Sequence, residues 1–160
     1  GAGFPGMPLK IMFPDLKITL ADSLNKRILF LDEVISELGL TDIQTVHARA
    51  EDLAHDPNYR EQYDYCVSRA VANLSSLSEY CLPFVRIGGS FISYKSGEIE
   101  EELAAAKKAI FLLGGQFDRV IPFQLEGTDL NRSFVVIRKE KKTAKTYPRK
   151  SGMPTKKPLG

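Results

Sequence analysis

The stretch KITLADSLNKRILFLDEVISELG, residues 17–39, decides the fold class. Its first four residues are typical of a short strand, and the turn residues Asp22 and Ser23 follow. Apolar residues then recur at steps of three and four from Leu24 to Leu38, which is the stripe of an amphipathic helix. Ser23 is a suitable N-cap for that helix, and Gly39 is a suitable end. The stretch therefore predicts a strand followed by a helix.

The same alternation of strand and helix continues along the chain. Apolar runs predict further strands at residues 43–47, 63–67, 90–94, 116–124 and 133–139. Helical periodicity predicts further helices at 7–13, 74–85 and 99–113. The turn between the last two strands is too short for a helical crossover, so these strands should pair antiparallel. The sequence predicts an α/β fold, with a mostly parallel sheet covered by helices on both faces.

Composition excludes several classes of protein. The chain has 160 residues, of which 43% are hydrophobic and 26% charged, as in an ordinary globular domain. No run approaches the ~18 apolar residues of a membrane span, and no basic-then-apolar leader opens the sequence. Cys66 and Cys81 lie in apolar stretches, which is typical of buried, reduced thiols in a cytosolic protein. His47 and His55 match no metal or catalytic-triad pattern, so we expect no metal.

Charge is distributed unevenly between the body and the end of the chain. Residues 138–160 contain nine Lys and Arg residues and one acidic residue. Residues 1–137 contain thirteen Lys and Arg residues and nineteen acidic residues. Such a basic end is either a phosphate-binding arm or a disordered, solubilising terminus, and charge alone favours neither. We expect one domain over residues 1–139 and a basic tail over 140–160.

A glycine-rich loop opens the chain. The spacing Gly1-x-Gly3-x-x-Gly6 lets backbone amides approach a ligand closely, although a plain glycine loop explains the pattern equally well. Asp22 lies about twenty residues further on, where a carboxylate can accept hydrogen bonds from both hydroxyls of a ribose. The alternative for Asp22 is a helix N-cap. Together the loop and the acid suggest a nucleoside-containing cofactor without identifying it.

Charged residues follow three other predicted strands. Because ligands collect at the carboxyl ends of strands in doubly wound sheets, Glu51 and Asp52 could face an adenine. The first turn of a helix is the favoured explanation for this pair. Arg69 could hold a carboxylate or phosphate through its planar guanidinium, or form a surface ion pair. Lys95 is a weaker candidate of the same kind.

Five segments, in order, resemble one family. They are GAGFPGMPLKI at residues 1–11, LADSLNKRIxFL at 20–31, ARAE at 48–51, SRAVA at 68–72 and YPRKSGMPTKKPL at 147–159. They resemble the bacterial small-subunit ribosomal RNA guanine-N7 methyltransferases, also called glucose-inhibited division protein B. The resemblance covers essentially the whole chain. It implies a Rossmann-like S-adenosylmethionine-dependent methyltransferase sheet with an antiparallel final strand.

The resemblance also implies a site. The expected cofactor-binding residues are Gly1, Gly3, Phe4, Asp22, Ala50, Glu51 and Arg69. Of these, Phe4 is expected beside the methionine or adenosine part, Asp22 near the ribose, Ala50 and Glu51 along the adenine, and Arg69 also near the substrate. The expected RNA-binding residues are Lys139, Lys141, Lys142, Lys145, Arg149, Lys150, Lys156 and Lys157, with Tyr147 able to stack on a base.

The implied reaction methylates N7 of a guanine in 16S ribosomal RNA, free or within the small ribosomal subunit. That nitrogen has a lone pair and loses no proton on attack, so positioning rather than a catalytic base is expected. The setting expected is the cytoplasm, with no membrane partner. A monomer is expected, although the sequence itself leaves the oligomeric state open.

One departure from the family concerns the first strand. Family members carry an Asp-Val-Gly strand and helices before the glycine loop, and this sequence begins at the loop. We therefore expect an N-terminally truncated domain whose sheet lacks its first strand and half of the cofactor site. That departure keeps a second hypothesis open, a non-catalytic nucleotide-binding regulatory domain. A nicotinamide dehydrogenase, which shares the loop and the acid, is a third.

Overall fold

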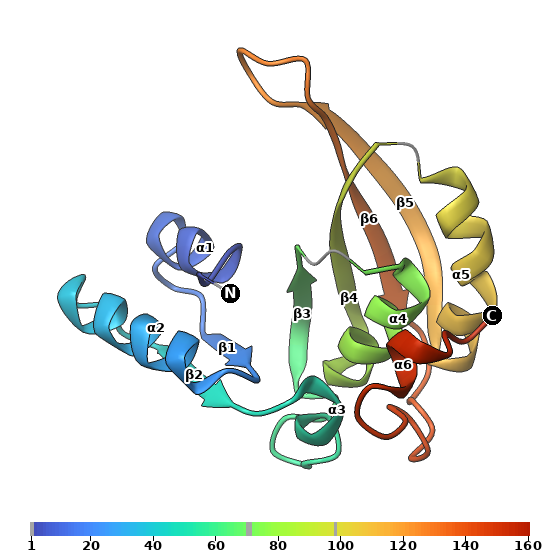
Figure 1. Cartoon of the computed structure of the whole chain (residues 1–160), viewed down its shortest axis with the longest axis horizontal. Coiled ribbons are helices and arrows are strands. Elements are labelled where there is room, and N and C mark those ends of the chain that lie inside the picture. The colour runs from blue at the N-terminus through green and yellow to red at the C-terminus, as the bar shows by residue number, and fades with distance from the viewer. Residues whose placement is uncertain (1, 70–71, 98) are drawn as a thin grey trace. The chain divides into compact units, whose positions relative to one another are not determined.

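The computed structural model describes residues 2–69, 72–97 and 99–160 (Figure 1). The chain divides into two compact units, Gly1–Ala50 and Glu51–Gly160. In the described part of the chain, no helix is long and apolar enough to cross a membrane. The expected boundary between a domain and a tail at residues 139 and 140 does not coincide with this division, since residues 140–160 belong to the second unit.

The first unit contains two helices and two strands. In chain order they are α1 (Gly6–Met12), β1 (Ile18–Asp22), α2 (Asn25–Glu37) and β2 (Ile43–His47). The two strands pair in parallel, with Asp22 opposite His47. The strand and helix predicted over residues 17–39 are confirmed as β1 and α2.

The helix cap expected at Ser23 is wrong. Leu24 is the N-cap residue of α2 and makes no side-chain cap. Its amide instead donates to the carboxylate of Asp22 at 2.9 Å. The capping function therefore falls to the acid one position earlier than expected, because an Asp side chain can reach the backbone two residues on.

The glycine loop packs closely on its own unit. Gly3 has a φ of +81°, and a Cβ at this position would come within 2.7 Å of Leu31 Cδ2. A Cβ at Gly6 would collide with Leu20 Cδ2. The left-handed backbone therefore favours glycine at position 3, whereas a side chain at position 6 would require the end of Leu20 to shift. These contacts place the loop beside both β1 and α2.

The second unit contains a four-stranded mixed sheet. Its elements are α3 (Ala50–Leu53), β3 (Tyr63–Ser68), α4 (Leu74–Cys81), a 3-10 helix (Leu82–Phe84), β4 (Val85–Ser96), α5 (Glu100–Leu112), β5 (Gly115–Gln124), β6 (Asn131–Lys139) and α6 (Met153–Lys156). The strand order is β3-β4-β6-β5. β3 and β4 are parallel, whereas β6 runs antiparallel to both neighbours. The predicted antiparallel pairing of the last two strands is confirmed.

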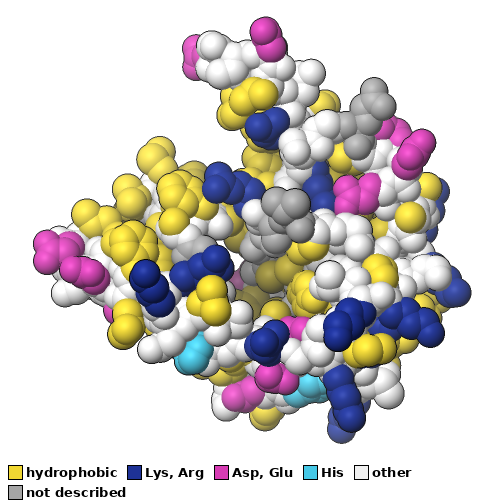
Figure 2. All heavy atoms as spheres, in the orientation of Figure 1, with side chains coloured by type: hydrophobic (Ala, Val, Ile, Leu, Met, Phe, Trp, Pro, Cys, Tyr) yellow, Lys and Arg dark blue, Asp and Glu magenta, His cyan; other side chains and the backbone are white. Residues whose placement is uncertain are grey.

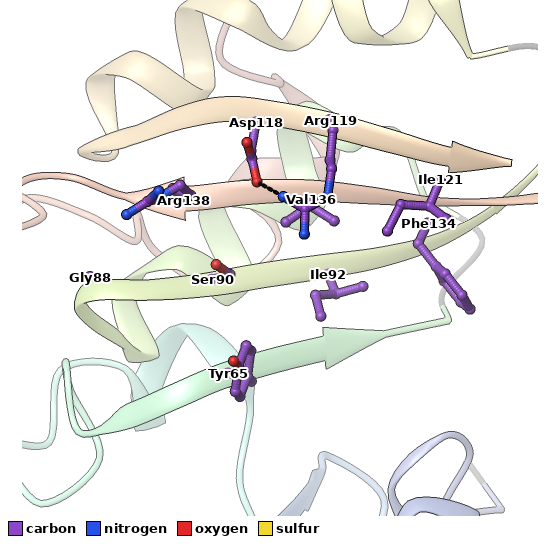
Figure 3. A pocket seen from close by; sticks show the side chains of 10 residues that line it. All are labelled: Tyr65, Gly88, Ser90, Ile92, Asp118, Arg119, Ile121, Phe134, Val136 and Arg138. Atoms are coloured by element: carbon purple, nitrogen blue, oxygen red, sulfur yellow. Dashed lines mark hydrogen bonds and ion pairs between the residues drawn. The ribbon is translucent and has the colours of Figure 1, made fainter.

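The core of the second unit lies on one face of this sheet. Helices α4 and α5 cover that face (Figure 1), where Leu77, Ile110, Phe91 and Ile137 pack together. The other face is hollowed over about 490 Å³ and carries Tyr65, Ile92 and Phe134, among other residues (Figure 3). Within the described part of this unit, α4 and α5 thus cover one face of the sheet. Among the described residues, those expected to bind the cofactor do not line the hollow.

Candidate functional site

The expected loop residues lie where the first unit begins. Gly1 lies outside the described residues, and Gly3 and Phe4 directly precede α1. The left-handed backbone of Gly3 turns the chain into α1, whose first residue, Gly6, contacts Leu20 of β1. Phe4 is 55% exposed. The loop and the end of β1 are therefore brought together within one unit.

Asp22 is the last residue of β1, and its side chain binds the backbone at the start of α2. One carboxylate oxygen accepts the amide of Leu24 at 2.9 Å, and the other lies 3.3 Å from Nη1 of Arg27. The side chain is only 9% exposed. The capping role is thus present in the structure. It does not exclude a ribose contact, because the two oxygens of a carboxylate can accept more than these two hydrogen bonds.

Glu51 has a partner that the sequence did not indicate. Its side chain is buried, and its carboxylate accepts the amide of Gly152 at 2.8 Å and the hydroxyl of Ser151 at 3.3 Å. The structure shows that this carboxylate holds the end of the chain through Oε1, and its place along an adenine stays a prediction. Asp52 beside it is exposed on α3, as expected for a first-turn acid.

Arg69 directly follows the last residue of β3 and is exposed. Ser68 lies opposite Ser93 in the parallel register, so the carboxyl ends of β3 and β4 are adjacent. Lys95 lies two residues further along β4, where its ammonium binds the carbonyl of Ala72 and the carboxylate of Glu102. Lys95 was a candidate for binding an anionic ligand, and the structure gives it an anionic partner from the chain itself.

Two of the residues expected to bind RNA are structural. Lys139 is fully buried; its ammonium donates to the carbonyl of Leu82 and the hydroxyl of Thr143, and Glu61 lies 3.5 Å away. Burial lowers the pKa of Lys139 to about 8. The expectation of a phosphate contact from Lys139 is wrong, because a phosphate cannot reach a buried ammonium. Arg149 binds the buried carboxylate of Glu79 at 2.7 Å.

The other six lysines are exposed on a folded segment. They are Lys141, Lys142, Lys145, Lys150, Lys156 and Lys157. Figure 2 shows Lys and Arg side chains gathered around α6. Arg60 donates to the carbonyls of Thr143, Ala144 and Tyr147, and Ser76 donates to that of Pro154. These bonds fix the segment on the second unit, and Tyr147, expected to stack on a base, is partly buried against the core.

Neither the cysteines nor the acidic residues form a metal centre in the described part of the chain, which has no suitable cluster of three or more ligands. Cys66 and Cys81 are free thiols. A hydrogen bond with Cys66, together with burial, raises the pKa of Cys81 well above its ordinary value. A thiol held in the protonated form is a poor nucleophile.

Sequence patterns missed the partners of these charged groups. Glu102 is separated from Lys95 by seven residues, whereas Glu79 and Arg149 are seventy apart. The acidic first turn of α5 is visible in the sequence as a feature that favours the helix start, and nothing marks Glu102 in particular. Only the fold brings such groups together.

Comparison with known proteins gives consistent matches. Residues 1–132 match the family described as GidB, rRNA small subunit methyltransferase G. Relatives named ribosomal RNA small subunit methyltransferase G include those of Acetivibrio thermocellus, 55% identical over 159 residues, and Clostridium novyi, 52% identical over the same length. Each match covers 99% of this chain and 65% of the relative, so the chain spans just under two thirds of the length of these relatives.

Solved structures show the same fold at low sequence identity. TYW2 of M. jannaschii, solved in complex with AdoMet, has a TM-score of 0.64 at 14% identity; the match covers 87% of this chain and 65% of that one. A putative methyltransferase of Thermoplasma acidophilum has a TM-score of 0.63 at 9% identity, and the match covers 89% of this chain and 66% of that chain. The fold of this chain is therefore the Rossmann-like fold of the methyltransferases.

Proposed function

This chain belongs to the rRNA small subunit methyltransferase G family, and from that premise we propose that it transfers the methyl group of S-adenosylmethionine to N7 of a guanine in 16S ribosomal RNA. The observation that carries the proposal is the match of residues 1–132 to this family, which includes the glycine loop and the strand ending at Asp22. The proposed setting is the cytoplasm, and the proposed partner is the RNA or the small ribosomal subunit. We propose that the protein acts as a monomer.

The residues of the first unit fit a nucleoside cofactor. Gly3 makes the left-handed turn that leads the chain into α1, and Phe4 beside it is 55% exposed. Asp22 offers a carboxylate at the carboxyl end of β1, where ligands gather in folds of this kind. We propose that these three residues, with the backbone of Ala50, bind S-adenosylmethionine. Glu51 and Arg69 are proposed cofactor contacts on the strength of the family match alone. When bound, this cofactor supplies an electrophilic methyl group on a sulfonium.

The six exposed lysines of residues 140–160 are the proposed RNA contacts. A folded segment with this density of positive charge can neutralise several phosphates and release the counterions condensed on them. Lys139 and Arg149 are left out of this role, since the first is buried and the second is paired with Glu79. Their proposed contribution is to hold the segment that carries the other lysines.

The chain's own residues need to position the reactants and do not need to remove a proton. N7 of guanine attacks through its lone pair, so alignment of the two reactants is the main source of rate. Both histidines are engaged by backbone carbonyls: Nε2 of His47 lies 3.1 Å from Ser23 O, and Nε2 of His55 lies 2.8 Å from Pro148 O. The guanine edge that carries N7 must be accessible, which favours an unpaired or opened region of the RNA.

A transfer assay tests the proposed function. The protein is incubated with tritiated S-adenosylmethionine and with either small-subunit or large-subunit ribosomal RNA. We expect label in the small-subunit RNA alone. Absence of label from both, under conditions in which calorimetry detects binding of S-adenosylhomocysteine, would remove the catalytic function and leave a nucleotide-binding domain.

A further inference from the structure

Arg60 donates hydrogen bonds to four backbone carbonyls. Its Nη1 donates to Ala54 O at 2.8 Å and to Tyr147 O at 2.9 Å. Its Nη2 donates to Thr143 O at 2.8 Å and to Ala144 O at 3.1 Å. A guanidinium suits such a set of acceptors, because its N–H groups lie in one plane and point in fixed directions. Three of the four carbonyls belong to the terminal segment that carries the exposed lysines.

Thr143 uses all of its polar groups at the same place. Its amide donates to Oε1 of Glu61 at 2.8 Å, and its carbonyl accepts from Arg60. Its hydroxyl donates to Leu113 O at 2.7 Å and accepts from the ammonium of Lys139. Thr143 is only 4% exposed, so water competes little for these bonds. The position of Thr143 is therefore fixed by contacts within the second unit.

Three exposed lysines lie beside this fixed residue in the chain. Lys141 and Lys142 come directly before Thr143, and Lys145 comes two residues after it. The backbone of Lys141 is itself bound, since its amide donates to Gly114 O at 2.9 Å. The folded unit thus sets where the chain presents these three ammonium groups.

An ordered basic surface recognises RNA differently from a flexible basic tail. Both release counterions for each phosphate that they neutralise, so equal numbers of contacts give the same salt dependence. Flexible lysines accept any arrangement of phosphates and lose conformational freedom with each one. Ordered lysines avoid most of that loss, and they favour the RNA whose phosphates match their positions. Position can therefore be tested separately from charge.

We propose that the terminal segment selects folded ribosomal RNA over unstructured RNA by the arrangement of its phosphates, and that Arg60 is the positioning residue for this selection. The inference rests on the proposed function, because it takes the exposed lysines as the RNA contacts. Arg60 acts through the carbonyls of Thr143, Ala144 and Tyr147. It makes no phosphate contact of its own, since its two terminal nitrogens are engaged by carbonyls.

The binding test compares Arg60→Lys with Arg86→Lys. Lysine keeps the charge, but one ammonium cannot reach the four carbonyls that Arg60 binds. Arg86 is the matched control, because it is exposed and pairs with Asp64 at 2.7 Å, away from the terminal segment in the chain. Filter binding without S-adenosylmethionine measures Kd for small-subunit ribosomal RNA and for polyuridylic acid, an unstructured strand.

We expect Arg60→Lys to bind small-subunit RNA about tenfold or more weakly than the wild type, and polyuridylic acid within about twofold, because a flexible strand adjusts to lysines that have moved. The slope of log K against log salt concentration should stay the same for both RNAs, since no charge is lost. Arg86→Lys should match the wild type throughout. An equal loss of affinity for both RNAs, or no loss for small-subunit RNA, overturns the inference.

Amide hydrogen exchange at Tyr147 gives a second readout in the absence of RNA. This amide donates to Ala144 O at 2.9 Å, within the turn that Arg60 binds. Exchange at Tyr147 should be about tenfold or more faster in Arg60→Lys and unchanged in Arg86→Lys. Unchanged exchange in Arg60→Lys contradicts its positioning role.

A second variant covers the case in which Arg60→Lys does not fold. Thr143→Val also keeps the net charge and removes only the hydroxyl that bonds to Leu113 and Lys139, so it replaces Arg60→Lys in both measurements. The outcome is separate from that of the transfer assay, because neither measurement contains a methyl donor. If the wild type transfers no methyl group, the proposed function fails. The selective loss of small-subunit RNA binding then still decides whether Arg60 positions the lysines.

Discussion

Arg149 and Glu79, seventy residues apart, join the end of the chain to the core of the second unit. Nη2 of Arg149 lies 2.7 Å from Oε2 of Glu79, and the backbone amide of Arg149 donates to Oε1, also at 2.7 Å. Glu79 is fully buried, and its hydrogen bond raises the pKa of Arg149. A basic residue expected to bind phosphate is thus part of the structure that supports the lysines proposed to bind RNA.

Replacing Glu79 with Gln should lower the free energy of unfolding by about 3 kcal/mol, because it leaves the charge of Arg149 without its buried partner. Glu126→Gln is the matched control, since Glu126 is exposed in the turn between β5 and β6 and should change stability by less than about 0.5 kcal/mol. Urea denaturation at pH 7 measures both. Equal stability of Glu79→Gln and the wild type would mean that this pair does not fix the terminal segment.

Lys139 should make stability depend on pH in an unusual direction. Because its pKa is about 8 in the folded protein and 10.5 in an unfolded chain, the unfolded chain binds more protons between these values. The contribution of Lys139 to stability is therefore lowest below pH 8 and rises as the pH increases. The difference in unfolding free energy between wild type and Lys139→Met should increase by about 2 kcal/mol from pH 7 to about pH 9.5. A difference that stays constant over this range contradicts the lowered pKa.

The lysines around α6 should control the salt dependence of RNA binding. Replacing Lys150, Lys156 and Lys157 with Gln should reduce the slope of log K against log salt concentration by about 0.7 to 0.9 for each phosphate that is no longer neutralised. Replacing Lys107 and Lys108, which are exposed on α5, with Gln is the control for general charge. The measurement is a filter-binding titration at several salt concentrations. If both sets of substitutions reduce the slope per charge equally, the terminal segment has no specific role.

Two substitutions of Asp22 separate its role as a helix cap from its proposed contact with the ribose. Asn is as good a cap as Asp, so Asp22→Asn should keep the bond to the Leu24 amide and leave stability within about 0.5 kcal/mol. Asp22→Ala removes the cap and should cost about 1 kcal/mol. Both variants should bind S-adenosylhomocysteine about tenfold or more weakly by calorimetry, because the Asn amide accepts ribose hydroxyls less strongly than a carboxylate and the Ala side chain accepts none. If Asp22→Asn binds S-adenosylhomocysteine with wild-type affinity, Asp22 acts as a helix cap and does not contact the ribose.

Local patterns predicted the elements well and the long-range contacts poorly. The strand and helix over residues 17–39 follow from apolar periodicity, and the antiparallel pairing of β5 with β6 follows from the length of their turn. The start of β4 at Val85 was missed, because Gly88 and Gly89 suggest a loop. The structure shows that a Cβ at Gly89 would collide with the carbonyl of Asp64, so this glycine allows β3 and β4 to approach closely.

For the candidate site, too, local features could be predicted from the sequence and long-range contacts could not. The positions of Gly3 and Phe4 before α1, and of Asp22 at the end of β1, could be predicted because they depend on short sequence spacings. The engagement of Glu51 by Gly152 could not be predicted, because the two lie a hundred residues apart and only the folded second unit brings them together. Charge counting correctly marks residues 138–160 as basic and cannot distinguish the buried ammonium of Lys139 from the exposed lysines that follow.

The nucleoside that receives the methyl group tests the central claim most directly. Small-subunit ribosomal RNA transcribed with guanosine, and the same RNA transcribed with 7-deazaguanosine, are each incubated with the protein and tritiated S-adenosylmethionine, digested to nucleosides and separated by chromatography. We predict that label from the first RNA elutes as 7-methylguanosine and that the second RNA, which lacks the N7 atom, takes up none. Label in another nucleoside, or equal label in both RNAs, would contradict methylation at N7 of guanine.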